Sequence, residues 1–287
     1  MNKKWIVSLI AIATLGLAGF ALTRPQPIDF KQERIPTLFF HGGGSSYRAE
    51  EHMVKAARDS GVTKTIIRAN VTDEGQVTLI GELKADASNP IVEVNYENNL
   101  QMDYSKHGAY AIAVVKKLQE VYAFDQVKMV GHSFGNVSIL EYMIQGTGDA
   151  SLPKLVKQVD IAGHFAGLTF EGMPEEAKLP DGMTLDQEGK PSIMNETYQE
   201  LSKARQAYPK GQVEVLNIIG DIGDGSDGSV QNISTLSLKY LVADRAKSYR
   251  EEWIKGDGGQ HSKLHENPEV DQLLIHFLWE KKESASN

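Results

Sequence analysis

A serine stands between glycines at the point where a predicted strand gives way to a predicted helix. The pentapeptide Gly-His-Ser-Phe-Gly at 131–135 comes directly after the predicted strand 127–130, and a helical pattern starts at Phe134. A serine in this position lies on a strained strand-to-helix turn, which the flanking glycines let the backbone make without side-chain clashes. Because the turn projects the hydroxyl above the sheet, Ser133 is predicted to be a nucleophile, with an inert turn serine as the alternative.

Two backbone N–H groups are predicted to face this serine. The helix that begins at Phe134 presents N–H groups and the positive end of its dipole to Ser133. Earlier in the chain, the tetrapeptide His-Gly-Gly-Gly at 41–44 follows the apolar run 35–40, and such a turn can bring a second donor to the same oxygen. We therefore expect the N–H groups of Gly43 and Phe134 to hold an oxyanion. The turn lacks the features of a P-loop or a dinucleotide fingerprint, so nucleotide binding is disfavoured.

A histidine and three aspartates later in the chain complete a set of groups for nucleophilic catalysis. Asp221, Asp224 and Asp227 all follow one apolar strand pattern, and His261 comes just before the terminal helical pattern. The chain order serine, acid, histidine is the one expected for a serine on a turn of this kind. The histidine would take the proton of Ser133 and return it to the leaving group, while the acid fixes the imidazole tautomer. Position after the strand does not separate the three aspartates.

Other polar residues have simpler interpretations. His261 and His265 are four residues apart, as in some metal sites, but the proline at 268 predicts that the helix starts after both. The aspartates at 221–227 suggest calcium, yet their spacing of three does not match the alternate ligands of an EF-hand loop. We therefore predict no metal site. Three further histidines are interpreted as structural residues with hydrogen-bond partners: His41, His132 and His164.

The composition of the 287-residue chain excludes several classes of protein. Hydrophobic residues make up 41% and charged residues 24%, which is ordinary for a globular protein with a real core. The net charge of −8 argues against a nucleic-acid partner, since such proteins need a basic surface. The absence of cysteine from the sequence removes disulfides, thiol catalysis and zinc–thiolate sites.

The first residues predict export. Lys3 and Lys4 precede the uncharged stretch 5–22. A basic start followed by an apolar run is typical of an export signal, and this run is close to the roughly 20 residues that span a bilayer. Residues 1–24 are therefore interpreted as a signal peptide or an N-terminal membrane anchor, and both alternatives stay open. In either case the remainder is exported, secreted or tethered at the cell surface.

Strand patterns alternate with helix patterns from residue 35 onward. This alternation predicts an α/β fold with a mostly parallel sheet covered by helices on both faces. The runs 65–71 and 77–80 flank a glycine-containing turn and predict a hairpin. Residues 25–34 are interpreted as a linker and 35–287 as one domain, because no linker divides the latter.

One connection is longer than a crossover requires. The 50 residues from 163 to 212 lie between two strand patterns, where a plain helical connection needs far fewer. Within them, 196–208 is predicted to supply the crossover helix. The preceding stretch, 168–194, is rich in Pro, Gly, Asp and Glu with scattered apolar residues. This stretch is interpreted as a small lid over a pocket, with a surface loop of no functional role as the alternative.

Taken together, these segments resemble the α/β-hydrolases, and more narrowly the membrane-anchored cell-surface serine hydrolases of low-GC Gram-positive bacteria. The segments that carry the resemblance are Phe-His-Gly-Gly at 40–43, Gly-His-Ser-Phe-Gly at 131–135, Asp-Gly-Ser-Val at 227–230 and His-Ser-Lys-Leu at 261–264. The resemblance implies the α/β-hydrolase fold, a serine esterase or lipase-like activity, and no cofactor.

The resemblance also bears on three details. Asp227 matches the acid-bearing loop of these proteins more closely than Asp221 or Asp224, so the resemblance implies Asp227 as the acid. Asn136 departs from the pattern, because a second small residue, usually glycine, is expected there. Phe134 replaces the commoner methionine or leucine. Neither departure touches the nucleophile, but both can change how the helix packs and the shape of the pocket floor.

The sequence therefore predicts an exported serine hydrolase that cleaves a carboxylic ester through an acyl-enzyme. Ser133 attacks, His261 moves the proton and Asp227 orients the imidazole, while the N–H groups of Gly43 and Phe134 hold the oxyanion. We expect a small-molecule ester as partner, no nucleic acid, and membrane contact only through the N-terminal segment. The alternatives are a non-catalytic surface binding protein with the same fold and a hydrolase of amides or thioesters.

Overall fold

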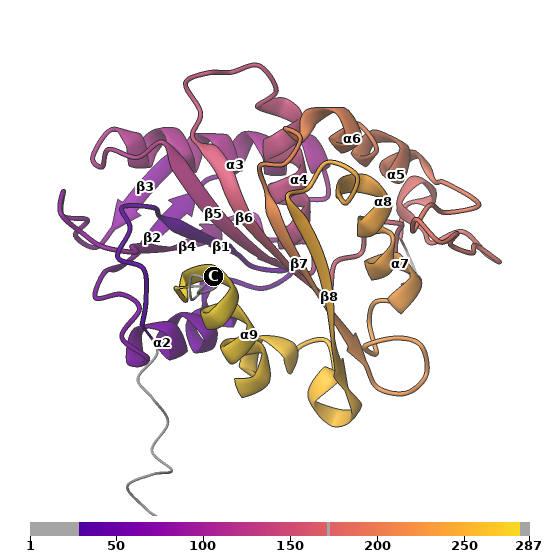
Figure 1. Ribbon diagram of the computed structural model, residues 1–287. Helices are drawn as coiled ribbons and strands as arrows, with labels where there is room; N and C mark the ends of the chain where they lie inside the picture. The colour runs from indigo at the N-terminus through magenta and orange to yellow at the C-terminus, as the bar shows by residue number, and fades with distance from the viewer. Residues whose placement is uncertain (1–28, 171–172, 282–287) are drawn as a thin grey trace, which may run out of the picture. The chain divides into compact units, whose positions relative to one another are not determined.

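The structure is a computed structural model that describes residues 29–170 and 173–281 (Figure 1). The predicted signal or anchor at 1–24 lies outside the described residues. Among the residues that are described, no helix combines the length and apolar character needed to cross a membrane.

The chain divides into two compact units. The smaller comprises Met1–Lys31 and Glu280–Asn287, and among its described residues Phe30 pairs with Glu280 in an isolated antiparallel bridge. The larger unit, Gln32–Trp279, contains the sheet and all the predicted site residues.

An eight-stranded sheet forms the centre of the larger unit, in the order β3-β2-β4-β1-β5-β6-β7-β8. Its strands are β1 (Thr37–Phe40), β2 (Ile66–Val71), β3 (Val77–Ile80), β4 (Ile91–Tyr96), β5 (Gln126–His132), β6 (Lys154–Ile161), β7 (Glu214–Asp221) and β8 (Ser248–Lys255). Neighbouring strands are parallel except for the predicted hairpin of β2 and β3, which is antiparallel. The mostly parallel sheet predicted from the alternating pattern is confirmed.

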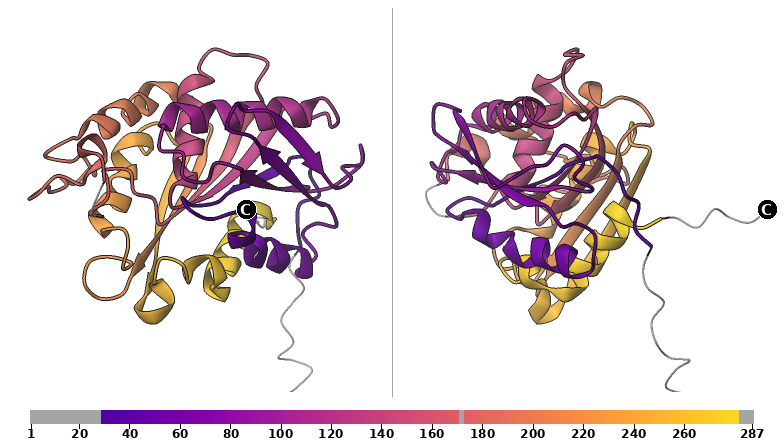
Figure 2. Two further views of the ribbon diagram at one scale, coloured as in Figure 1. Left: turned by 180° about the vertical axis from the view of Figure 1, so that it is seen from behind. Right: turned by 90° about the vertical axis from the view of Figure 1, so that its left-hand side faces the viewer.

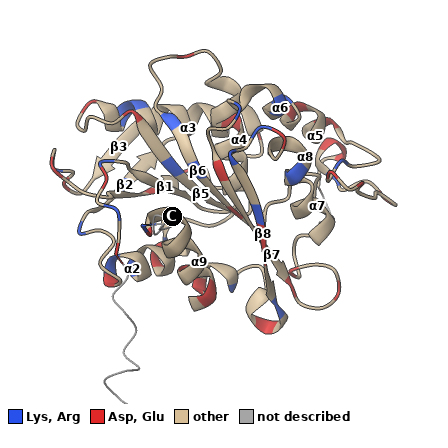
Figure 3. Ribbon diagram, in the orientation of Figure 1, with Lys and Arg blue, Asp and Glu red and all other residues tan. Residues whose placement is uncertain are grey.

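Helices cover both faces of this sheet. They are α2 (Glu51–Asp59), α3 (Tyr104–Gln119), α4 (Gly135–Gln145), α5 (Glu196–Leu201), α6 (Ala204–Ala207), α7 (Asn232–Leu236), α8 (Leu238–Val242) and α9 (Pro268–Trp279). Figures 1 and 2 show α2 and α9 on one face and α3, α4, α6 and α8 on the other. Burial on both faces explains why the central strands read as nearly continuous apolar runs; all four residues of β1 are buried. Charged residues of both signs are interspersed over the outer helices and loops (Figure 3).

Two elements differ from the expectation. The crossover helix predicted over 196–208 is broken into α5 and α6 at Ser202 and Lys203. The edge strand β8 has no counterpart in the sequence analysis. Five of its eight residues are polar, because an edge strand packs apolar groups less completely and commonly carries charges. Its pairing with β7 along eight positions is a long-range contact that a local pattern does not reveal.

The proposed lid segment, 168–194, is a loop with little regular structure in its described part. It contains a 3-10 turn, η2 (Glu175–Ala177), and two isolated bridges. Leu168 and Met183 are buried, whereas Phe170 is exposed. The segment is thus attached to the core through apolar side chains, and its role as a lid stays a prediction.

Candidate active site

Ser133 lies on the sharp turn between β5 and α4 that the sequence predicts. Its φ is +52°, in the left-handed region that non-glycine residues rarely adopt. The N–H of Ser133 donates to the carbonyl of Ile161 at 2.9 Å, which ties the turn to the end of β6. A Cβ at Gly135 would overlap the carbonyl of Phe40, so glycine is required there for α4 to approach β1. The turn is therefore strained and held by its surroundings.

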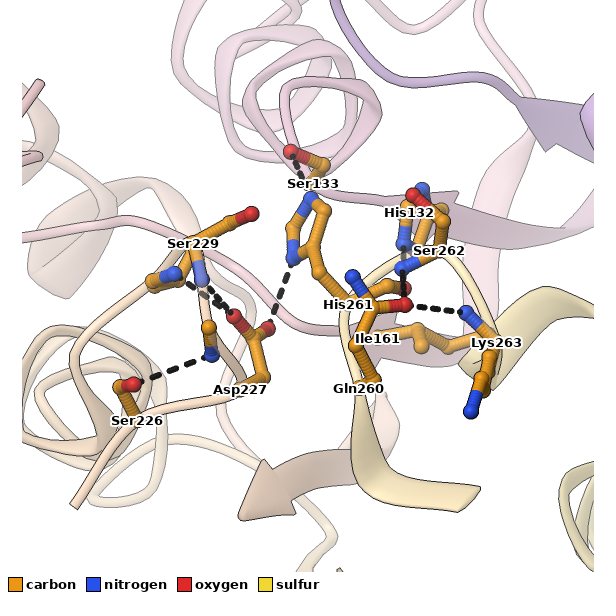
Figure 4. Close-up of polar contacts among 12 residues, drawn as sticks. His132, Ser133, Ile161, Ser226, Asp227, Ser229, Gln260, His261, Ser262 and Lys263 are labelled. Carbon is orange, nitrogen blue, oxygen red and sulfur yellow. Dashed lines mark hydrogen bonds and ion pairs between the residues drawn. The ribbon is translucent and has the colours of Figure 1, made fainter. Parts of the chain in front are cut away.

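The structure brings Ser133, Asp227 and His261 together from three loops that follow β5, β7 and β8 (Figure 4). His261 Nε2 lies 3.0 Å from Ser133 Oγ, and His261 Nδ1 lies 2.7 Å from Asp227 Oδ2. The Asp227 side chain is 2% exposed and that of His261 13%. With Nδ1–H donating to the carboxylate, Nε2 is left free to accept the serine proton.

The Asp227 carboxylate is fixed by its own loop. Its Oδ1 accepts the backbone N–H groups of Ser229 at 2.9 Å and Val230 at 2.6 Å, which leaves Oδ2 for His261. These two bonds fix the orientation of the carboxylate, so Oδ2 is held in place to accept a hydrogen bond from His261.

The other two candidate aspartates face their own turns instead. Asp221 Oδ1 accepts the N–H of Gly223 at 2.8 Å, and Asp224 Oδ1 accepts the N–H and hydroxyl of Ser226 at 3.0 and 2.7 Å. Both side chains therefore cap local turns, as Asp commonly does. Across residues 29–170 and 173–281, no group of three or more His, Asp or Glu side chains is arranged to hold a metal ion.

The two expected oxyanion donors lie beside the serine. A Cβ placed on Gly43 would stand 3.8 Å from the Cβ of Phe134, and one on Gly42 would stand 3.1 Å from the Cβ of Ser133. No acceptor in the described part of the chain takes the N–H of Gly43 or Phe134. Strands β1 and β5 are neighbours in the sheet, which is why the turns that follow them meet.

His41 is a satisfied structural histidine, as predicted, and its tautomer is determined. Its Nε2 accepts the backbone N–H of Tyr96 at 3.1 Å, so the proton must be on Nδ1, which donates to the carbonyl of Gly42 at 2.8 Å. Burial lowers the pKa of His41, although the bond to Gly42 opposes this. The neutral ring therefore links the glycine turn to the end of β4.

His132 also has a partner, as predicted. Its Nε2–H donates to the carbonyl of His261 at 3.0 Å, and the two rings are 4.8 Å apart between centroids. Burial, followed by the neighbouring histidines His261 and His265, keeps the pKa of His132 well below its ordinary value. The neutral ring thus supports the loop that carries His261.

The prediction that His164 has hydrogen-bond partners is wrong. The residue lies three positions after the end of β6, and its ring lies 5.1 Å from that of Phe134 and 6.5 Å from that of Tyr104 between centroids. Its side chain is buried, and neither ring nitrogen has a hydrogen-bond partner among the described residues. Aromatic rings therefore surround a group that the sequence pattern could not distinguish from His41 or His132.

Exposed apolar side chains lie beside two of the loops that form the candidate site. Leu100 is 71% exposed, and a Cβ on Gly44 would contact its Cδ2 at 3.8 Å. Ile222 is 40% exposed and stands in the same relation to Gly228, at 3.4 Å from its Cδ1. Sequence reasoning did not identify these two residues, because isolated apolar residues in loops carry no pattern.

Comparison with known proteins places this geometry in context. A family model described as "Alpha/beta hydrolase of unknown function (DUF915)" matches residues 24–281. No curated protein gives a significant match.

Several solved structures are similar to this chain. A gene product of Listeria innocua is 26% identical, with a TM-score of 0.75, covering 88% of this chain and 96% of its own. A protein described as a putative cell surface hydrolase from Lactobacillus plantarum is 19% identical, with a TM-score of 0.69, covering 86% and 92%. A peroxisomal alpha-beta-hydrolase of Saccharomyces cerevisiae is 10% identical, with a TM-score of 0.50, covering 88% and 77%.

Proposed function

Because this chain belongs to the DUF915 family of α/β-hydrolases and has the corresponding fold, we propose that it is a serine hydrolase that cleaves a carboxylic ester. The observation that carries the proposal is the position of His261, 3.0 Å from the hydroxyl of Ser133 and 2.7 Å from the carboxylate of Asp227. A nucleophile, a base and a group that orients the base are the parts needed for covalent acyl transfer.

Acylation begins at Ser133. As its Oγ attacks the ester carbonyl carbon, His261 Nε2 takes the hydroxyl proton, and Asp227 stabilises the resulting imidazolium. The carbonyl oxygen becomes an oxyanion that accepts hydrogen bonds from the N–H groups of Gly43 and Phe134. When the tetrahedral intermediate collapses, the bond to the alcohol oxygen breaks and His261 gives its proton to that oxygen.

Deacylation repeats these steps with water. His261 takes a proton from a water molecule, whose oxygen attacks the acyl carbon of the ester on Ser133. The same two N–H groups hold the second oxyanion. Collapse breaks the bond to Ser133 Oγ, which recovers its proton from His261, and the carboxylic acid leaves.

The substrate side of the proposal rests on Leu100 and Ile222. Exposed apolar groups beside the catalytic loops favour a substrate with an apolar acyl or alcohol part, since burying apolar area contributes about 25 cal/mol per Å². Amide or thioester substrates are the second chemical class, because the same three groups can attack either.

A labelling experiment tests the proposal directly. A fluorophosphonate should react with the folded protein and add its mass to the peptide containing Ser133. Ser133→Ala should abolish both labelling and hydrolysis of p-nitrophenyl esters, whereas Ser262→Ala, which removes the exposed hydroxyl next to His261, should retain them. A folded wild-type protein that neither labels nor hydrolyses any ester would support the alternative of a non-catalytic binding protein.

We further propose that the protein is exported. Support comes from the basic start and apolar stretch 5–22 and from the description of the Lactobacillus plantarum structure as a cell surface hydrolase. The mass of the exported protein and the cell fraction in which it is found distinguish a secreted form from a membrane-tethered one. A product starting near Thr23 means secretion, an intact N-terminus in the membrane fraction means a tether, and a full-length soluble cytoplasmic protein would contradict export.

A further inference from the structure

The two peptide groups that carry the proposed oxyanion donors are held at their opposite ends. One peptide joins Gly42 to Gly43, and the other joins Ser133 to Phe134. In a planar trans peptide the C=O and the N–H point in opposite directions, and no cis peptide occurs in the described ranges. A side chain that fixes the carbonyl of either residue therefore also fixes the direction of the N–H that follows.

Asn136 holds the second of these carbonyls. Its Nδ2 donates to the carbonyl of Ser133 at 2.8 Å and to that of Ile161 at 2.9 Å. The backbone N–H of Asn136 reaches the Ser133 oxygen at 3.2 Å, so the side chain makes the shorter contact. The side chain is fully buried and ties the nucleophile turn to the end of β6.

Two glycines leave space for this side chain. A Cβ on Gly131 would stand 2.7 Å from Asn136 Oδ1, and one on Gly163 would stand 3.2 Å from Asn136 Nδ2. The departure at position 136 from the small residue expected by resemblance is thus accommodated by the surrounding backbone.

His41 holds the first carbonyl in the same way. Its Nδ1–H donates to Gly42 O at 2.8 Å, while its Nε2 is occupied by the N–H of Tyr96. Each oxyanion peptide therefore has a buried side-chain donor on its carbonyl and an N–H with no acceptor in the described structure.

We propose that Asn136 and His41 are positioning residues that keep the N–H groups of Phe134 and Gly43 aimed at the oxyanion. This inference rests on the proposed function, because it assigns a purpose to a site that binds an oxyanion. The positive φ of Ser133 makes the support necessary, since a strained turn without it can relax by rotating its peptide. Donors that are already oriented stabilise the transition state without reorganisation.

The test removes the donor of Asn136 and keeps its shape. Asn136→Leu should lower kcat for p-nitrophenyl butyrate about 10- to 100-fold, short of the roughly 10²–10³-fold loss seen when an oxyanion donor is deleted outright. KM should change by less than about threefold, because the ground-state ester has no oxyanion. The inhibition constant of an alkyl trifluoromethyl ketone, which forms an oxyanion on Ser133, should rise in parallel with the loss in kcat. His41→Phe should have the same pattern through the other peptide.

Asn217 provides a matched control. It is a fully buried asparagine on β7 whose Nδ2 donates to Thr235 O at 3.0 Å and to Tyr249 Oη at 3.2 Å. Its Oδ1, like that of Asn136, has no hydrogen-bond partner among the described residues. Asn217→Leu should reduce thermal stability as Asn136→Leu does, but leave kcat and ketone binding unchanged.

The possible results distinguish failure of the positioning role from failure of the proposed hydrolase function. If the wild type is active and Asn136→Leu keeps wild-type kcat and ketone affinity, the positioning role is refuted and the hydrolase proposal stands. Equal loss of kcat in the Asn217 control would also refute it, because the effect would then be general destabilisation. If Asn136→Leu does not fold, Asn136→Ala carries the same test. A wild type that neither labels nor turns over refutes both.

Discussion

Asp227 and His261 are joined twice. Besides the contact between the carboxylate and Nδ1 at 2.7 Å, the backbone N–H of His261 donates to the carbonyl of Asp227 at 2.8 Å. The second bond fixes the distance between the two loops independently of the side chains. The geometry of the pair should therefore survive a change of charge at position 227.

We expect Asp227→Asn to leave the fold intact and to lower kcat by about 10⁴, the loss known for this substitution in the serine protease template. The new amide would place a donor opposite Nδ1 and favour the wrong imidazole tautomer. Asp221→Asn and Asp224→Asn should cost far less, because those carboxylates cap local turns. Steady-state kinetics of the three variants decide the matter. If Asp221→Asn loses most of its kcat and Asp227→Asn keeps a nearly normal kcat, the acid that orients His261 is Asp221, at the end of β7.

The apolar residues Leu100 and Ile222, beside the loops of the proposed active site, should set the preference for acyl-chain length. Leu100→Ser and Ile222→Ser should each lower kcat/KM for long acyl esters by about 3- to 10-fold, consistent with losing roughly 1 kcal/mol of apolar contact, and leave acetate esters unaffected. Ile80→Ser is the control, since Ile80 is 45% exposed on β3. An unchanged chain-length profile in both loop variants would show that the substrate lies elsewhere.

Shortening the lid segment should alter selectivity more than stability. Replacing residues 169–176 by a short glycine-serine loop removes the exposed Phe170 and keeps the buried Leu168 and Met183. We expect a changed ratio of kcat/KM between short and long esters, with a thermal midpoint close to that of the wild type. An identical ratio would show that the segment is a surface loop with no role in substrate selectivity.

Glu50 should make the protein less stable as pH rises. Burial, followed by the nearby Glu93, raises the pKa of Glu50 to about 8. Between about pH 4.5 and 8 the unfolded carboxyl is ionised while the folded one keeps its proton, so stability falls as pH rises through this window. Glu50→Gln should therefore raise the free energy of unfolding by roughly 1–3 kcal/mol at pH 8 and little at pH 4.5. Urea titrations at both pH values measure this, with the half-exposed Glu51→Gln as control. A Glu50 variant with no gain at pH 8 would contradict the burial argument.

His164 should make the protein less stable as pH falls. Burial, followed by the neighbouring His261 and His107, lowers the pKa of His164 to about 3. Below about pH 6.5 the unfolded histidine binds a proton that the folded one does not, so stability is lost toward pH 3. His164→Phe should remove this loss and add about 1–2 kcal/mol at pH 7, because an unsatisfied buried polar group disappears. A less stable Phe variant at pH 7 would mean that an ordered water satisfies the ring.

The sequence predicted those features whose signals are local. The serine turn, the hairpin and the central strands each follow from a run of neighbouring residues, and the structure contains all of them. Strand β8 was not predicted, because its polar composition does not indicate a strand. It is a strand because it pairs with β7, which is a long-range contact. The choice among three aspartates could not be made from position alone, since each follows the same strand.

The same limit applies to the polar side chains of the site. Asn136 carried a signal only as a departure from a pattern, and its bond to Ile161 joins residues 25 apart in the chain. His41 and His164 look equivalent as sequence, yet one has two partners and the other none within the described structure. Which histidine is satisfied depends on the backbone groups that the fold brings to it.

The position of β8 at the edge of the sheet has a consequence for how the enzyme can be switched off. Among the strands that the structure describes, β8 pairs only with β7, and it leads directly into the loop that carries His261. The turn that carries Ser133 and the two proposed oxyanion donors follow β1 and β5, in the middle of the sheet. Fraying of the outermost strand would therefore withdraw His261, the proposed base, while leaving Ser133 and the proposed oxyanion donors assembled. Turnover would therefore measure whether β8 is paired with β7. It should be lost before any loss of the central fold can be measured.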